Sequence, residues 1–248
     1  MQFYKTLSSV LCHVIAFGLF VSQSAHAAAI TGGNATLSIN NTAFANSGAY
    51  GFYIANTYDA SFNNTSMYSN TAPSGGSSFG LTDTSVLTMQ VNTNTITTFN
   101  ASVNRSLQAT TMDPLSTGSG QIGLSGALYL RSNSIPGYMS AFDFDLINKA
   151  GSWLLQSNDA GWSPSNPALG FLELTNVTQS INNGQFTLNG NLAWDPNGAW
   201  APMFGASGGN LGTLSLTAQV SSVPVPAAVW LFGSALAAFG LTGRRKTA

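Results

Sequence analysis

The middle of the chain alternates apolar and polar residues with a period of two. Between residues 28 and 222, short stretches place apolar side chains at every second position, which is typical of half-buried β-strands. The clearest stretches are 121–131, 142–146, 186–194 and 211–220, and shorter ones are 35–39, 49–54, 85–91, 95–99, 102–107, 152–156 and 168–177. Turn-forming sequences such as Asp195-Pro196-Asn197-Gly198 separate them. The pattern predicts an all-β body with almost no helix.

About a dozen short strands with this punctuation predict a single antiparallel β-sandwich of the jelly-roll type. A β-solenoid is the alternative, but the chain has no repeat of fixed period. The composition changes near residues 110–120, from an Asn-, Thr- and Ser-rich half with weak alternation to a half with longer, better patterned strands. Two small domains therefore remain an alternative, although we expect one sandwich with a less regular first half.

The N-terminus has the pattern of a signal peptide. Lys5 supplies the positive charge, residues 7–21 form an apolar run, and Ala25-His26-Ala27 provides a small-residue cleavage site. We expect export through the Sec translocon and cleavage after Ala27. A retained N-terminal anchor is the alternative, and the shortness of the apolar run argues against it. The expected organisation is a signal peptide at 1–27, an extracytoplasmic body at 28–222 and a C-terminal segment at 223–248.

The C-terminal segment has three parts in a fixed order, namely a proline pair, an apolar run and a basic cluster. As a helix, residues 225–243 would be about 28 Å long, just enough for a hydrocarbon core of about 30 Å. Lys and Arg that flank a span stay on the cytoplasmic side, so the body is expected outside the inner membrane. Composition alone therefore predicts a membrane-spanning helix, which an ordinary single-pass anchor would also have.

The same segment resembles the PEP-CTERM sorting signal of Gram-negative bacteria, which combines a Pro-x-Pro motif, a short apolar helix and a terminal Arg/Lys cluster. The matching motif is Val223, Pro224, Val225 and Pro226, the helix includes Ala227, Trp230, Leu231, Phe232, Gly233 and Leu241, and the basic stop is Arg244, Arg245 and Lys246. Val225 replaces the glutamate of the Pro-Glu-Pro form, which bears on the exosortase variant that recognises the signal. The resemblance covers only this tail and implies nothing about the fold of the body.

The resemblance implies that the membrane enzyme exosortase is a partner and that this chain is its substrate. It also implies a transient membrane anchor and a final location at the cell surface or in an extracellular, exopolysaccharide-containing biofilm matrix. The site of cleavage and the final attachment stay open.

The composition of the body excludes several kinds of chemistry. Cys12, His13 and His26 all precede residue 28, so the body has no disulfide and no Cys or His ligand for zinc. Its basic residues are Arg105, Arg131 and Lys149, against eight acidic residues, which gives a net charge of minus five. Nucleic acid is excluded as a partner because its binding depends on clustered Lys and Arg.

Carboxylates are the remaining candidates for metal or acid–base chemistry. Asp143 and Asp145 are two residues apart in a predicted strand, so both are expected on the face opposite Phe142 and Phe144. A solvated outer face is the simplest account of the pair. Ca²⁺ ligation with loop carbonyls and the two carboxyl groups of a glycosidase are the alternatives. We name no catalytic residue and no metal or cofactor, with Ca²⁺ at this pair as the open alternative.

Tryptophan residues beside turns are candidates for sugar contacts. Trp162 and Trp200 lie next to turn sequences that contain Asp and Asn, and an exposed aromatic ring in such a setting can stack on a sugar. Packing in the core is the alternative, because Trp is highly buried on average.

Two classes of function remain open. The first is a non-enzymatic, exosortase-processed surface or matrix protein with a structural or adhesive role, associated with exopolysaccharide. The second is a secreted carbohydrate-binding module or glycan-active enzyme that uses the exposed Trp and Asp residues. We expect the first, because the tail carries the stronger pattern.

Overall fold

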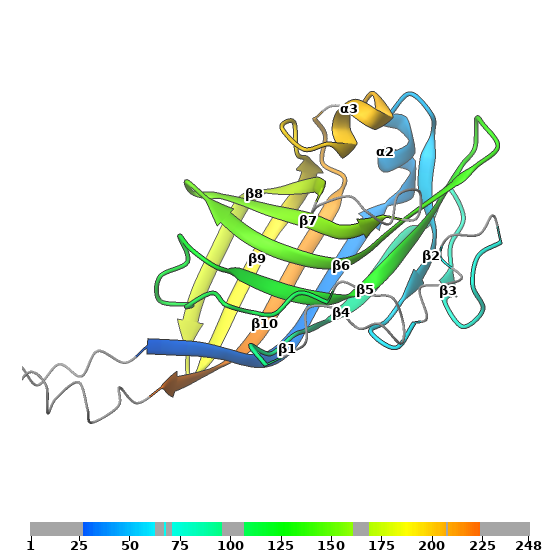
Figure 1. The fold of residues 1–248 in the computed structure, drawn as a ribbon. Helices are drawn as coiled ribbons and strands as arrows, with labels where there is room; N and C mark the ends of the chain where they lie inside the picture. Colours follow the sequence, from blue (N-terminus) through cyan, green and yellow to red (C-terminus); the bar gives the residue numbers. More distant parts are fainter. Residues whose placement is uncertain are drawn as a thin grey trace, which may run out of the picture. The chain divides into compact units, whose positions relative to one another are not determined.

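The computed structural model describes residues 27–62, 67, 71–95, 107–160, 169–206 and 208–223 (Figure 1). The chain divides into two units, residues 28–221 and the two chain ends, and the first unit contains the elements of the fold. Its elements are β1 (Ala27–Asn40), α2 (Asn41–Asn46), β2 (Phe52–Tyr58), β3 (Ser77–Ser78), β4 (Thr84–Val91), β5 (Gln121–Ser132), β6 (Tyr138–Lys149), β7 (Ser152–Ala160), β8 (Leu169–Asn182), β9 (Gln185–Trp194), α3 (Trp200–Phe204) and β10 (Gly212–Val223).

Eight of these strands close into an antiparallel β-barrel. They are hydrogen-bonded in the order β5-β4-β1-β10-β9-β8-β7-β6, and β6 pairs back with β5 to complete the ring. The predicted sandwich is therefore wrong, while the all-β class is confirmed. Alternation with a period of two specifies that one face of each strand is buried. It does not specify whether that face packs on a second sheet or on the inner wall of its own sheet.

Strand β5 is the branch point of the sheet. Its first part pairs with β4, for example Leu124 with Val91, and its second part pairs with β2, for example Leu130 with Ile54. The opposite edge of β5 pairs with β6 along its whole length, with a register shift between Leu124 and Ala127. Strands β2 and β3 therefore extend from the side of the closed ring.

The barrel interior is filled by alternate side chains of its strands. On β4, Leu87, Met89 and Val91 point into the core while Thr88 and Gln90 face outward. Helices α2 and α3 lie at one end of the barrel (Figure 1). Their aromatic rings continue the core at that end, as in the contacts of Phe44 with Trp194 and of Phe52 with Phe204.

A second apolar cluster lies on the outer side of β5 and β6. Its members are Ala55, Tyr58, Phe62, Met67, Ala127, Tyr129 and Phe142. Leu128 and Leu130 belong to the inner core. Ala127 and Tyr129, which alternate with them along β5, belong to the outer cluster. Both faces of this part of β5 are thus buried, which explains its continuous run of buried residues.

The predicted membrane-spanning helix has no counterpart in the part of the chain that the structure describes. No helix there is long and apolar enough to cross a membrane. The residues predicted to form the spanning helix, 225–243, lie outside the described residues, as do residues 1–26 of the predicted signal peptide and Pro224 of the sorting motif. Val223 is the last residue of β10.

Candidate functional site

Asp143 and Asp145 do not form a solvated face. Both side chains are buried, with exposed fractions of 0% and 2%. The backbone of Asp143 has a φ of 51°, which interrupts the alternation of β6. Phe144 after it belongs to the inner core, and Phe142 before it belongs to the outer cluster. Phe142 and Phe144 therefore do not share one face of β6, as strict alternation would require.

The carboxyl group of Asp145 is held by one amide. Asn158 Nδ2 on β7 donates a hydrogen bond to Asp145 Oδ1. Burial raises the pKa of Asp145, while the Asn158 hydrogen bond and the charge of Lys149 act in the opposite direction. Among the described residues, no group of three or more His, Cys, Asp or Glu side chains could hold a metal ion.

Trp200 packs inside the barrel end. It is fully buried, and its ring centroid lies 4.9 Å from that of Phe171 and 5.4 Å from that of Phe204. No face of the ring is therefore available for stacking on a sugar. Its indole Nε1 is the one buried side-chain nitrogen or oxygen without a hydrogen-bond partner in the described chain. Trp162, the other predicted sugar contact, lies outside the described residues.

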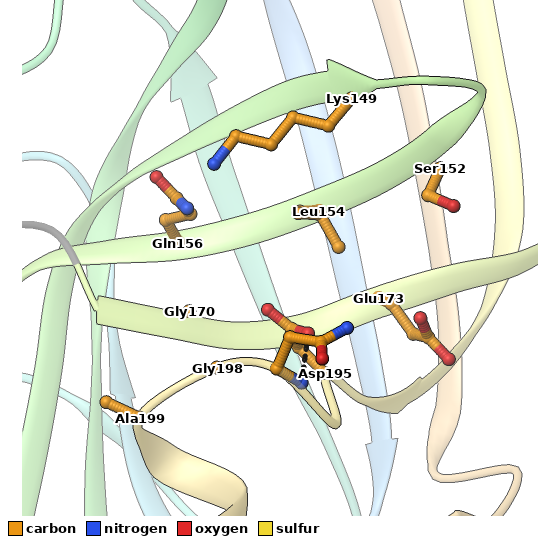
Figure 2. Close-up of a pocket in the computed structure, with 10 residues that line it drawn as sticks. Lys149, Ser152, Leu154, Gln156, Gly170, Glu173, Asp195, Gly198 and Ala199 are labelled. Carbon is orange, nitrogen blue, oxygen red and sulfur yellow. Dashed lines mark hydrogen bonds between the residues drawn. The ribbon is translucent and has the colours of Figure 1, made fainter.

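A polar groove lies on the outer side of the barrel, over β6, β7, β8 and the turn that follows β9 (Figure 2). We call it the outer groove. It has a volume of about 510 Å³ and is lined by Lys149, Ser152, Leu154, Gln156, Gly170, Glu173, Asp195, Asn197, Gly198 and Ala199. Antiparallel pairing brings the lining residues together, because Lys149 lies opposite Ser152, and Leu154 lies opposite Glu173.

The turn after β9 forms one wall of the outer groove. Asp195 Oδ1 accepts a hydrogen bond from the backbone N–H of Asn197 at 2.9 Å, and Gly198 N donates to Asp195 O at 3.0 Å. The turn lies directly on β8, since a Cβ at Gly170 would be 2.6 Å from Gly198 Cα. Only glycine at these two positions permits so close an approach. The turn therefore holds Asp195, which is 4% exposed, in a fixed orientation at the groove.

The groove is lined by one cationic side chain, Lys149, and two anionic ones, Glu173 and Asp195, with no ion pair between Lys149 and either of them. In Figure 2 the ammonium group of Lys149 lies toward Gln156, and the carboxylate of Glu173 lies at the other end. The hydrogen bonds of Asp195 with lining residues are those within its own turn, from Asn197 N to its Oδ1 and from Gly198 N to its backbone O. Leu154 lies between Ser152 and Gln156 on the same face of β7 and provides an apolar floor.

Sequence reasoning did not select the outer groove. It treated Asp195 as part of a turn, and it gave Lys149 only as one of three cations. The turn signal was the one local hint, because a tight Asx turn fixes its own carboxylate. The contributions of Lys149, Gln156 and Glu173 depend on strand register, which is not visible in the sequence.

A second candidate surface, which we call the neutral face, is the outer side of β9, β10, β1 and β4 together with that of residues 178–182 of β8. Its members are Asn34, Thr36, Ser38, Thr84, Val86, Thr88, Gln90, Thr178, Ser180, Gln185, Thr187, Asn189, Asn191, Thr213, Ser215, Thr217 and Gln219. None of them is charged. Some bond across strands, as Ser215 Oγ does to Asn189 Oδ1 at 2.7 Å.

The chain matches no family model and no curated protein. Among solved structures, it is similar to the C-terminal domain of HtaA from Corynebacterium glutamicum, with 14% sequence identity and a TM-score of 0.42. The alignment covers 78% of this chain and 99% of that domain. A similarity at this level supports no conclusion about the chain.

Proposed function

We propose that the chain is an exported cell-surface or extracellular-matrix protein, processed by exosortase, with a non-enzymatic adhesive role toward exopolysaccharide. The neutral face is the observation that supports the adhesive role. It presents hydroxyl and amide groups from five neighbouring strands without a single charged side chain.

Such a face suits a long neutral polymer. Hydroxyl and amide groups both donate and accept hydrogen bonds, as sugar hydroxyls do. A single hydrogen bond exchanged with water contributes only about 0.5–1.5 kcal/mol, so useful affinity requires many repeated contacts along the polymer. Because the face carries no charge, its binding should depend little on salt.

Barrel closure favours adhesion through side chains over adhesion through strand addition. A sandwich would leave open sheet edges, which are templates for pairing with another chain. In the described part of the chain, the closed ring leaves β3, a strand of two residues, at the end of the sheet order. The proposed adhesive surface is therefore the neutral face and not a sheet edge.

The tail supports the sorting part of the proposal. Pro224, Pro226 and the terminal Arg244-Arg245-Lys246 resemble the sorting signal in their order along the chain. The test is the intact mass of the protein from its native host, beside a strain without exosortase. We expect the native form to end near Pro226 and the mutant form to keep the tail through Arg245. Full-length tails in both strains would contradict the sorting proposal.

The adhesive part is tested by co-sedimentation with the host's exopolysaccharide at low and high salt. We expect binding that changes little with salt. The fourfold variant Thr187→Ala, Asn189→Ala, Ser215→Ala and Thr217→Ala should bind at least about tenfold more weakly, because four neighbouring contacts are lost. The double variant Ser116→Ala and Ser119→Ala, outside the neutral face, is the control. Equal binding by the fourfold variant and the control would contradict the proposal.

A further inference from the structure

We propose that the outer groove is a distinct binding site for a neutral, hydroxyl-rich ligand, of the size of a short saccharide. The inference rests on the proposed function for the source of such a ligand, but it concerns a different surface. Three features of the groove support the inference, namely its charges, its shape and the fixed turn that forms one wall.

The mixed charges favour a neutral ligand. A simple anion in the groove would meet the carboxylates of Glu173 and Asp195, and a simple cation would meet the ammonium group of Lys149. A polyol avoids both conflicts, because each hydroxyl can donate to a carboxylate and accept from an ammonium or amide group. Hydrogen bonds that involve a charged partner are roughly twice as strong as neutral ones. The three charged groups therefore become sources of affinity for a polyol.

The shape fits a small ring with one apolar side. The volume of about 510 Å³ lies within the range of about 300–1,000 Å³ that is typical of small-ligand sites. Leu154 forms an apolar patch on the floor, flanked by the polar groups of Ser152 and Gln156. A sugar ring has C–H groups for such a floor and hydroxyls at its edge for such flanks. The arrangement matches the usual design of ligand sites, which place few polar groups around an apolar surface.

The site is partly organised before a ligand arrives. Asp195 is held by the N–H of Asn197, and the Gly170–Gly198 contact fixes the turn against β8. Side chains that are already ordered lose less entropy on binding. Asp195 is therefore the fixed point of the site, while Glu173 comes from the adjacent β8 and Lys149 from β6, beyond β7.

The experiment is isothermal titration of the full-length protein in the presence of a chelator. The probes are neutral trisaccharides (maltotriose, cellotriose and mannotriose), glucuronic acid, glucosamine and the zwitterion glycylglycine. We expect at least one neutral trisaccharide to bind and the three charged probes to bind more weakly. Glu173→Gln and Gln156→Ala should each weaken trisaccharide binding by about tenfold. Ser119→Ala, at an exposed position outside both the outer groove and the neutral face, is the control and should leave trisaccharide binding unchanged.

Three results would overturn the proposal. The first is no binding of any neutral trisaccharide, the second is tightest binding of glycylglycine, and the third is trisaccharide binding that neither groove variant weakens. Glu173 and Gln156 are both partly exposed, so two independent variants guard against a folding defect in one. Failure here leaves the proposed function intact, because that function is tested by processing of the tail and by the fourfold variant of the neutral face.

Discussion

Asn41 and Ile54 exchange two hydrogen bonds through the side chain of Asn41. Asn41 Nδ2 donates to Ile54 O at 2.8 Å, and Ile54 N donates to Asn41 Oδ1 at 3.0 Å. Asn41 Nδ2 also donates to Gly80 O at 2.9 Å, and the side chain is fully buried. The side-chain amide of Asn41, at the start of α2, thus bonds the backbone N–H and C=O of Ile54 in β2, as a neighbouring strand would.

Replacement of Asn41 by Ala should lower the free energy of unfolding by about 3 kcal/mol or more. The change leaves the N–H and C=O of Ile54 and the C=O of Gly80 without this partner, and each unsatisfied buried group costs about 1–3 kcal/mol. Urea unfolding measures the loss. Thr42→Ala is the control, because it removes one exposed hydrogen bond to Leu81 O. A cost for Asn41→Ala no larger than that of the control would contradict this account.

The contact between the first and last strands of the barrel depends on Gly33. A Cβ there would lie 2.2 Å from Thr217 O, and the contacting atom is backbone that cannot rotate away. Gly32 has a similar positive φ, 152° against 137°, but a Cβ there would meet nothing within 4 Å. Gly33→Ala should therefore destabilise the protein by about 2 kcal/mol more than Gly32→Ala. Only the methyl group at position 33 would push β1 away from β10. Equal melting temperatures of the two variants would contradict a close contact between β1 and β10 at Gly33.

Asp145→Asn should stabilise the protein at neutral pH. Burial raises the pKa of Asp145 in the folded state, so its ionised form is disfavoured there relative to the unfolded chain. For a raised carboxyl pKa, stability is lost as the pH rises from the unfolded pKa, about 4, through the folded pKa. The variant avoids this loss and keeps an oxygen that accepts the Asn158 hydrogen bond.

The gain from Asp145→Asn should therefore disappear at a pH below both pKa values. Thermal melts from pH 3 to pH 8 measure this dependence. The stability difference between wild type and variant should change with pH as expected for about one titrating group. Asp145→Ala is the comparison, because it also removes the acceptor for Asn158 and should be less stable than Asp145→Asn. A pH-independent difference between wild type and Asp145→Asn would show that the carboxyl charge does not matter.

Tyr58 should ionise only in strong alkali. Burial, with a smaller contribution from Tyr129, raises the pKa of Tyr58 to about 12, and its hydroxyl donates to Pro73 O at 2.8 Å. Because the folded pKa exceeds the ordinary value of about 10, stability should fall as the pH rises from 10 toward 12. Tyr58→Phe should cost about 1 kcal/mol at neutral pH through the lost hydrogen bond.

The alkaline titration is followed by the ultraviolet absorbance of tyrosinate. The change near pH 12 should be smaller in Tyr58→Phe than in the wild type, and what remains should include Tyr129, whose pKa burial also raises. Tyr50, which is exposed, offers the matched variant Tyr50→Phe, which should keep the change. Loss of the change in Tyr50→Phe instead would contradict the assignment.

Period-two alternation located most of the strands. The predicted stretches 85–91, 121–131, 186–194 and 211–220 are confirmed as the greater part of β4, β5, β9 and β10. The stretches 95–99 and 102–107 lie outside the described residues except for their end residues 95 and 107. The prediction missed the branch at β5 and the closure with β6. Both depend on pairing between distant strands, and the alternation within each strand is the same in a barrel and in a sandwich.

For the predicted site residues, too, the local pattern gave the position in the chain, and tertiary packing decided the exposure. Alternation placed Asp143 and Asp145 on a solvated face opposite Phe142 and Phe144, but the positive φ at Asp143 interrupts the alternation and both carboxylates are buried. The position of Trp200 beside a turn suggested exposure, yet α3 turns the ring into the barrel end.

By itself, the sequence determined the all-β class, the absence of Cys and His chemistry in the body, the low charge of its surface and the motif of its tail. These properties depend on composition and on the order of neighbouring residues. Only the tertiary structure decided that the sheet closes on itself, and that Lys149, Glu173 and Asp195 line one groove. Closure and the groove depend on the register of antiparallel strands, which brings together residues that have no local relationship along the chain.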